Sequence, residues 1–340
     1  MAAALPTFII PDNNLGLDLM RATEAAALAA GHWAGRGAKE SGDQAAVDAM
    51  RSVLNRIDID GTIIIGEGEK DEAPMLANGE KVGTGTGPRI DIAVDPVDGT
   101  RLLAWGMRNS IAVLAASEGG SMYDPTMCFY MTKLVVGADA ADVVDLDAPI
   151  AENIRRVAKA KGKDVSDVVV AVLNRERHEG LTAAIRAAGA RTRMFTDGDV
   201  AASVAAASPE VDIDMLAGVG GSPEGVVSAC AMKCLGGRIL ARLAPSTDEE
   251  RQRTIDAGHD VDRVLDTNDL VTSDNALFVA TGITEGDLVR GVRYRRDGSA
   301  VTQSVVMRSV SGTVRYVEAH HNLAKVDQYA REHAQELGLR

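Results

Sequence analysis

Two aspartates lie three residues apart in the string DPVDGT at residues 95–100, directly after the apolar run 90–94. The run predicts a strand, and because proline cannot continue a central strand we expect it to end at Asp95. A turn into a helix would then bring both carboxylates to one side of the strand end and leave main-chain N–H groups free to bind an anion. Two close carboxylates repel each other, and a hard divalent cation relieves that repulsion. The string therefore predicts a metal ion beside a phosphate group.

Three further acids stand at comparable corners of the expected elements. Glu67 follows an apolar strand in the string GEGE, Asp43 ends the loop GRGAKESGD before a helix, and Glu224 opens a helix in GGSPEG. Each of them, taken alone, is equally well explained as a helix cap or as a solvated turn residue. Together with the two aspartates of DPVDGT they exceed what capping requires, so we expect the five acids to meet at one site.

The hydrophobic periodicity predicts a layered α/β or α+β protein with two sheet-centred halves. Helices are expected at 15–34, at 44–56, at 199–207 and after the strands of the second half, up to about 188 and 235. The strands expected in the first half lie at 62–65, 90–94 and 110–116. Those expected after the polar linker 137–150 lie at 168–173, 192–195, 211–217, 277–280, 289–294, 301–307 and 313–318.

Composition excludes several classes of function. The 340 residues are 46% hydrophobic and 25% charged and carry a formal net charge of −13, which disfavours a nucleic-acid or anionic-membrane surface. The three cysteines form no C-x-x-C pair, so we expect neither a disulfide framework nor a zinc ribbon. The N-terminus lacks the basic flank of a signal peptide, and no apolar stretch is long enough to span a membrane. We therefore expect a cytoplasmic protein without nucleic-acid or membrane partners.

Longer strings resemble one family closely. They are GRGAKESGD, IIIGEGEKDEAPML, IDIAVDPVDGTR, FYMTK, TDGDVAAS, GVGGSPEGVVSA and ATGITEGDL, and they occur in this order within residues 15–326. The chain resembles class II fructose-1,6-bisphosphatase of the bacterial type, within the lithium-sensitive phosphatase superfamily that includes inositol monophosphatase. The resemblance implies the sugar-phosphatase fold, a five-layer αβαβα sandwich. It also implies a Mg²⁺- or Mn²⁺-dependent enzyme of gluconeogenesis, in which metal-activated water releases the 1-phosphate of fructose 1,6-bisphosphate and leaves fructose 6-phosphate.

The resemblance also implies roles for individual residues. The implied metal ligands are Asp43 and Glu67 for one ion, and Asp95, Asp98 and Glu224 for another. The residues tied to catalysis are Thr100, Lys39 and Glu67. The implied substrate contacts are Asp98, Gly99, Thr100, Tyr130, Arg175, Glu176, Arg177, Asp197, Gly198, Asp199 and Gly221. Glu176 departs from the family, whose loop usually has proline there, and adds an acid beside a phosphate. Arginine matches phosphate with two parallel hydrogen bonds, so Arg175 and Arg177 suit the distal, unreacting phosphate.

The expected organisation follows the same matches. We predict an N-terminal tail at 1–14, a metal- and phosphate-binding half at 15–150, a sugar-binding half at 151–326 that contributes Glu224, and a C-terminal tail at 327–340. The expected partner is a small sugar bisphosphate. The apolar character of the C-terminal strands favours a homo-oligomer.

Other functions stay open on the sequence. Within the hydrolases, the chain could act on sedoheptulose 1,7-bisphosphate or on inositol monophosphate, and initial rates on these substrates would discriminate. A non-catalytic phosphosugar-binding protein would have lost the metal-binding acids, yet all five are present. The glycine-rich strings GTGTGP and GVGG suggest a nucleotide-binding enzyme as a further alternative. However, GTGTGP lacks the strand before it and the helix after it that such a site requires.

Overall fold

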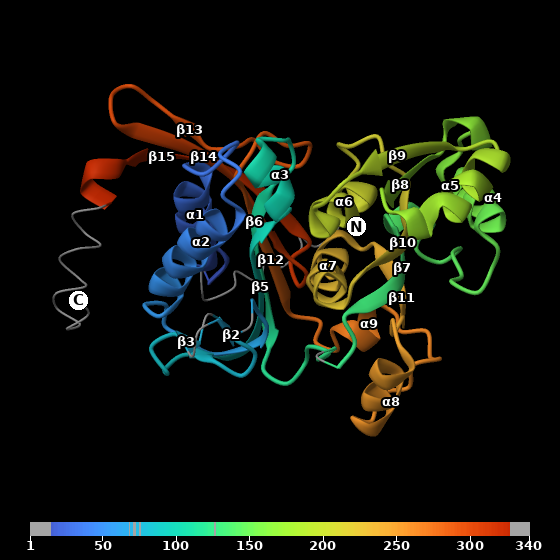
Figure 1. Cartoon of the computed structure of the whole chain (residues 1–340), viewed down its shortest axis with the longest axis horizontal. Helices are drawn as coiled ribbons and strands as arrows, with labels where there is room; N and C mark the ends of the chain where they lie inside the picture. The colour runs from blue at the N-terminus through green and yellow to red at the C-terminus, as the bar shows by residue number, and fades with distance from the viewer. Residues whose placement is uncertain (1–14, 68, 71–72, 75, 126, 327–340) are drawn as a thin grey trace, which may run out of the picture.

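Helices and sheets alternate in layers across the molecule (Figure 1). The computed structural model describes residues 15–326 apart from 68, 71, 72, 75 and 126, so the predicted tails at 1–14 and 327–340 lie outside the described residues. Helices α1 (Leu15–Gly31) and α2 (Lys39–Leu54) form one outer layer, α6 (Asp199–Ala207) and α7 (Ser222–Leu235) the middle one, and α4 (Ile150–Lys161) and α5 (Glu179–Ala187) the other outer layer. A sheet separates each pair of layers. The predicted layered αβαβα arrangement is confirmed.

The larger sheet is mixed and joins strands from both ends of the chain. Its order is β13-β14-β12-β6-β5-β1-β4, with β15 on the free side of β14. Strands β1 and β5 are parallel, and the remaining neighbours are antiparallel. The strands are β1 (Asp60–Ile65), β4 (Lys81–Val82), β5 (Arg89–Asp98), β6 (Ile111–Glu118), β12 (Ala276–Gly282), β13 (Arg293–Tyr294), β14 (Ser299–Arg308) and β15 (Thr313–Asn322).

The smaller of the two layered sheets is built from the middle of the chain. Its order is β11-β7-β10-β8-β9, and the strands are β7 (Tyr130–Val136), β8 (Val169–Leu173), β9 (Arg191–Phe195), β10 (Met215–Gly221) and β11 (Arg238–Leu243). The strands are therefore not shared out as two consecutive halves divided at residue 150. The chain enters the second sheet at 130, leaves it at 243 and returns to the first sheet at 276.

Short elements connect the layers. They are the paired strands β2 (Glu69–Lys70) and β3 (Ala73–Pro74), the helices α3 (Thr100–Trp105), α8 (Asp248–Asp256) and α9 (Thr267–Leu270), and the single 3₁₀ turns Ala138–Ala140, Val165–Asp167 and Glu176–His178. In the part of the chain that the structure describes, no helix has both the length and the apolar character needed to cross a membrane.

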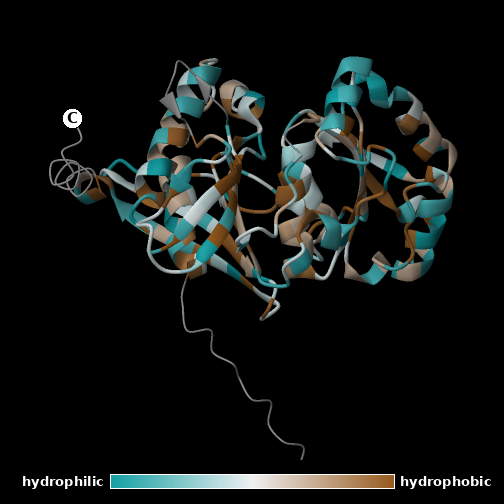
Figure 2. Cartoon of the chain, turned by 90° about the horizontal axis from the view of Figure 1, so that it is seen from below, coloured by the Kyte–Doolittle hydropathy of each residue, from teal (hydrophilic) through white to brown (hydrophobic). Residues whose placement is uncertain are grey.

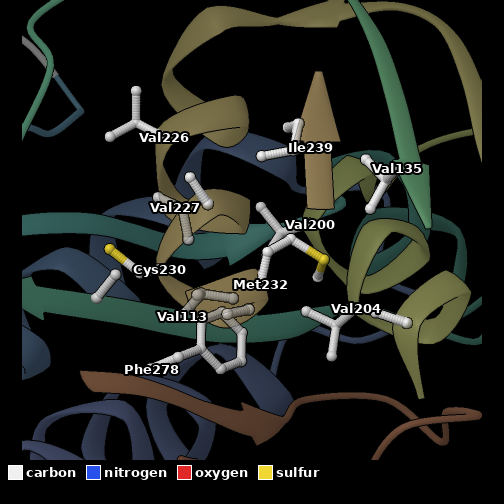
Figure 3. Close-up of a cluster of buried hydrophobic side chains, with 14 of the residues drawn as sticks. Val113, Val135, Val200, Val204, Val226, Val227, Cys230, Met232, Ile239 and Phe278 are labelled. Carbon is white, nitrogen blue, oxygen red and sulfur yellow. The ribbon is translucent and has the colours of Figure 1, made fainter. Parts of the chain in front are cut away.

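The middle helices carry the core that joins the two sheets. Their apolar residues surround the whole helix, which is the pattern of a helix packed on both sides. In Figure 3, Val200 of α6 and Val227 and Met232 of α7 lie among side chains of both sheets, such as Val113 of β6 and Ile239 of β11. In Figure 2 brown, hydrophobic segments run through the interior, while the outer helices alternate between teal and brown or tan residues. This packing holds the two sheets at a fixed separation, with the ends of their strands beside each other.

Two of the expectations nearest the predicted site are wrong. Strand β5 does not end at Asp95 but continues through Pro96 to Asp98, because a bulge between Asp95 and Asp98 removes the proline from the ladder with β6. Asp43 does not precede a helix but lies inside one, since α2 already begins at Lys39.

Other boundaries differ as well. The strand expected at 289–294 shrinks to Arg293–Tyr294, and the one expected at 211–217 runs from Met215 to Gly221. Strands β7 and β11 were not expected at all. The helix expected at 199–207 is confirmed to the residue.

Candidate active site

A cavity of about 550 Å³ lies where strand ends of both sheets face the middle helices. All five acids singled out in the sequence line it, and so do most of the predicted substrate contacts. The lining residues are Asp43, Glu67, Asp95, Val97, Asp98, Gly99, Thr100, Arg101, Phe129, Tyr130, Leu173, Arg175, Arg177, Asp197, Gly198, Asp199, Gly220, Gly221, Pro223 and Glu224. Residues more than 180 positions apart in the sequence thus share one space.

The bulge in β5 sets two carboxylates at the base of this cavity. Asp98 is only 3% exposed, and its Oδ2 accepts a hydrogen bond of 3.1 Å from the main-chain N–H of Ala201 in α6. Burial raises the pKa of Asp98 to about 8, because that bond offsets only part of the cost of desolvation. Burial and the carboxylates of Asp98, Glu67, Glu224 and Asp43 raise the pKa of Asp95 well above its usual range. The base of the cavity therefore gathers carboxyl groups without enough positive charge beside them to keep all of them ionised.

Glu224 reaches the same region from the first turn of α7. Among the described residues its Oε2 atom is buried without a hydrogen-bond partner. Burial raises the pKa of this carboxyl, while the positive charge of Lys133 opposes the rise. The carboxylate lies against the chain at Gly221, where an added Cβ would come within 1.7 Å of Oε2. Glycine at this position therefore makes room for the acid.

The donor set fits a hard divalent cation. All five acids supply carboxylate oxygens, and a buried carboxylate oxygen without a donor is the kind of atom that such an ion satisfies. Across the described residues, however, no three His, Cys, Asp or Glu side chains are gathered closely enough to hold an ion by themselves. Mg²⁺ typically takes one or two carboxylates and completes its shell with water and phosphate oxygens. The arrangement therefore suits an ion that arrives with a phosphorylated ligand.

Three arginines, Arg101, Arg175 and Arg177, line the same cavity. Arg175 donates from Nη1 to the carbonyl oxygens of Asn174 and Thr196, at 2.9 and 2.8 Å. Arg177 donates to the carbonyl of Val219 at 2.8 Å, and its guanidinium lies 5.3 Å from the ring centre of Tyr130. Main-chain and ring contacts use only part of each guanidinium. The remaining N–H groups suit a bound anion.

Asp197 contacts two of these arginines. It accepts the main-chain N–H of Arg101 at 3.1 Å, and its Oδ1 lies 4.0 Å from the Arg101 guanidinium and 3.7 Å from that of Arg175. One of the N–H groups expected to be free at the start of α3 is therefore already bonded. Gly198 follows with a φ of 84°, a left-handed conformation that glycine adopts readily, and it is the N-cap of α6.

The His178 side chain holds in place the loop that carries Arg175 and Arg177. The ring is buried, with Nδ1 2.7 Å from the carbonyl oxygen of Leu173, and Nε2 accepts the N–H of Val219 at 2.8 Å. A ring that donates from one nitrogen and accepts at the other is neutral. It ties the end of β8, which precedes Arg175, to β10, which bonds Arg177.

Two predicted residues lie outside the lining. Lys39 is exposed in the first turn of α2, and Glu176 is exposed in a shallow hollow beside the cavity with Arg175 and Arg177. Their predicted roles in catalysis and substrate binding stay predictions. Thr100, at the start of α3, and Tyr130, at the start of β7, both line the cavity.

Sequence reasoning missed two cationic residues of the site. Arg101 directly follows DPVDGT and lines the cavity. Lys133, in the string FYMTK, is fully buried beneath it and bonds Asp199. The signal for Arg101 was its place next to a predicted phosphate-binding turn. For Lys133 it was a charged residue inside an apolar run, at 130–136.

Comparison with known proteins agrees with the geometry. Residues 13–321 match the family model described as bacterial fructose-1,6-bisphosphatase, glpX-encoded. The chain is 45% identical over 334 residues to fructose-1,6-bisphosphatase 1 class 2 of Escherichia coli (strain K12), covering 94% of this chain and 98% of the relative. The class 2 fructose-1,6-bisphosphatases of Escherichia coli O6:H1 and Shigella flexneri match with the same identity and coverage.

Proposed function

The chain belongs to the family of bacterial, glpX-encoded class 2 fructose-1,6-bisphosphatases, and on that premise we propose that its cavity hydrolyses fructose 1,6-bisphosphate. The products are fructose 6-phosphate and inorganic phosphate, and the reaction serves gluconeogenesis. The observation that carries the proposal is one cavity lined by two sets of charged groups: five carboxylates, which we call the carboxylate side, and three arginines, which we call the arginine side. A sugar with a phosphate at each end needs both a reacting site and a holding site.

The reacting phosphate belongs at the carboxylate side. The family is one of metal-dependent phosphatases, and we propose Mg²⁺ or Mn²⁺ held by Asp43, Glu67, Asp95, Asp98 and Glu224. When bound, such ions neutralise phosphoryl oxygens, lower the pKa of water and stabilise the leaving alkoxide. The acids themselves must be ionised to bind a cation, so the raised pKa values of Asp95 and Asp98 favour a site that loses protons as it loads.

Residues of α3 position the reacting end. The Thr100 hydroxyl, in the first turn of α3, can donate to a phosphoryl oxygen or orient the attacking water. Lys39 lies four residues before Asp43 on α2, and we propose that it offsets negative charge near that acid. Uncatalysed hydrolysis of phosphate monoesters is among the slowest reactions known, so orientation and charge neutralisation together must lower the barrier greatly.

The distal phosphate belongs at the arginine side. Arg175 and Arg177 are held by main-chain carbonyls, so their guanidinium groups lose little additional freedom when they bind. Asp197, Gly198 and Asp199 line the same cavity, and the two carboxylates can accept hydrogen bonds from sugar hydroxyls. Binding energy at the distal phosphate then positions the reacting end.

This arrangement favours a bisphosphate over inositol monophosphate, since a monophosphate would leave the arginine side without a ligand. Sedoheptulose 1,7-bisphosphate carries both phosphates and stays the second candidate substrate. We further propose that the protein acts in the cytoplasm as a homo-oligomer.

The test is phosphate release by the purified chain. We expect release from fructose 1,6-bisphosphate with Mg²⁺ or Mn²⁺, none with EDTA, and a much lower rate with inositol monophosphate. The Glu67→Gln variant serves as the negative control, and circular dichroism checks that it is folded. A chain that binds the bisphosphate but releases no phosphate with either metal would contradict the proposal and support the binding-protein alternative.

A further inference from the structure

Lys133 is a charged residue in the interior of the second sheet. It lies on β7, between β10 and β11, and its side chain is 1% exposed. Lysine is almost never fully buried without a partner, because removing its charge from water costs several kcal/mol. A lysine in this place therefore needs compensating contacts.

Both contacts of the ammonium group belong to the cavity lining. Nζ donates to the carboxylate of Asp199 and, at 2.8 Å, to the carbonyl oxygen of Gly221. Asp199 begins α6, and Gly221 immediately precedes α7, whose first turn carries Glu224. One buried cation thus connects the starts of both middle helices at the point where they face the cavity.

Glycines leave the space that this pair occupies. A Cβ added at Gly220 would lie 2.1 Å from Asp199 Oδ2 and 3.0 Å from Lys133 Cε. A Cβ added at Gly225 would lie 3.6 Å from Lys133 Cδ and closer still to Met131. The Lys133 side chain can therefore reach from β7 to the starts of α6 and α7 because Gly220 and Gly225 have no side chains.

The charges around the cavity indicate what the contact between Lys133 and Asp199 does. The cations in the lining, Arg101, Arg175 and Arg177, are all partly exposed, whereas the acids include the deeply buried Asp98. Among the described residues, Lys133 is the buried cation that bonds an acid of the lining. A fixed internal charge keeps Asp199 in one orientation, which a solvated arginine does not do.

We propose that Lys133 is a positioning residue: it fixes the Asp199 carboxylate for the sugar of the substrate and holds the Gly221 carbonyl at the start of α7. The inference rests on the proposed function, since it assumes that Asp199 faces a phosphosugar. Lys133 itself has no side-chain atoms in the lining and acts through Asp199.

The test is a double-mutant cycle of Lys133→Met and Asp199→Asn, read by calorimetric binding of fructose 6-phosphate in EDTA and by kcat and KM with Mg²⁺. Each single substitution should weaken binding about 10-fold or more, as losses of supporting contacts commonly do. The double variant should bind no more weakly than either single one, because residues that act as a unit are not additive. Lys133→Gln, which retains a donor, should lie between the wild type and Lys133→Met.

Lys233→Met is the matched control. Lys233 is also a largely buried lysine bonded to an aspartate, with Nζ 3.0 Å from Asp274, but it lies in the last turn of α7. We expect this variant to retain the affinity of the wild type.

Each outcome decides the inference. Additive losses in the cycle, or unchanged binding by Lys133→Met, would overturn it. If Lys133→Met fails to fold, recovery of folding on adding Asp199→Asn supports the pair, and failure in both backgrounds shows a structural role that overturns it. If the wild-type chain releases no phosphate from the bisphosphate, the proposed function itself is wrong, whatever the result of the double-mutant cycle.

Discussion

The two sides of the cavity hold their charges in different ways. The carboxylate side includes a deeply buried acid: Asp98 is 3% exposed, and burial raises its pKa to about 8, whereas Glu67 is exposed. The arginine side is open to solvent, with side-chain exposures of 48% for Arg101 and 24% for Arg175. Asp95 and Asp98 lie at a strand bulge and Glu224 lies at a helix start, whereas the two arginines of the loop are held by main-chain carbonyls.

The difference assigns distinct work to each side. Charges in a medium of low dielectric interact strongly and change their protonation easily, which suits the step in which bonds break. Solvated guanidinium groups interact more weakly and exchange water for phosphate readily, which suits binding and release. We therefore expect the carboxylate side to control kcat and the arginine side to control KM.

The largest expected effect comes from the carboxylate side. Asp95→Asn removes one carboxylate charge without changing the size of the residue, and we expect kcat with Mg²⁺ to fall by more than about 100-fold, beyond the loss usual for supporting residues. Steady-state phosphate release measures it. Asp91, four residues earlier on β5, is the matched control, because its carboxylate accepts three main-chain N–H groups at 2.8–3.1 Å and lies outside the cavity lining. Asp91→Asn should lower stability by about 1–3 kcal/mol and leave kcat within a few-fold.

An intermediate effect, on KM, is expected from substitutions on the arginine side. Arg175→Gln and Arg177→Gln should each raise KM for fructose 1,6-bisphosphate about 10-fold, since a charge-assisted hydrogen bond is worth about 1.5–3 kcal/mol and exposure reduces that value. The value of kcat should change much less. Arg193→Gln is the control, because Arg193 pairs with Asp287 outside this cavity. If the two variants lowered kcat at unchanged KM, the division of labour between the two sides would be wrong.

The smallest effect concerns a buried acid far from the cavity. Burial raises the pKa of Glu24 in α1 to about 7, although Thr302 donates a hydrogen bond to it and Arg21 lies nearby. The unfolded chain releases this proton near pH 4.5 and the folded chain only near pH 7, so stability is full below pH 4.5 and falls as the pH rises between these values. The loss is on the order of 3 kcal/mol.

Glu24→Gln removes this titration, so the variant should be more stable than the wild type at pH 8 and equally stable at pH 4. Urea unfolding at both pH values measures the difference. The exposed acid Glu40 provides the control substitution, Glu40→Gln, and kcat should be unchanged in both variants. A pH slope that survives Glu24→Gln would show that another group causes it, and a change in kcat would mean that buried acids outside the cavity also affect the reaction.

Much of the layered fold was predictable from local patterns. Helix α6 begins at the predicted residue, because Gly198 and Asp199 mark its start clearly. Strand β7 was not predictable in the same way, since Lys133 interrupts its apolar pattern and only the fold reveals that Asp199 compensates the charge. The passage of β5 through Pro96 was also hidden, because a bulge depends on the register with a neighbouring strand.

The same distinction applies to the site. The acids could be identified because each stands beside a turn or a helix start in the sequence. The contact between Arg101 and Asp197 could not, because it joins residues 96 positions apart and depends on how the two sheets approach each other. Local chemistry therefore identified the acids that line the cavity, while the contacts that support them required the tertiary structure.

The return of the chain to the first sheet has a consequence for biosynthesis. The second sheet is complete once residue 243 has left the ribosome, but β6 receives its partner β12 only when residues 276–282 emerge. Until then the nascent polypeptide carries an apolar strand with one open edge, which is the condition that invites mispairing. A premature stop between these points should therefore give an aggregating fragment rather than a smaller working enzyme.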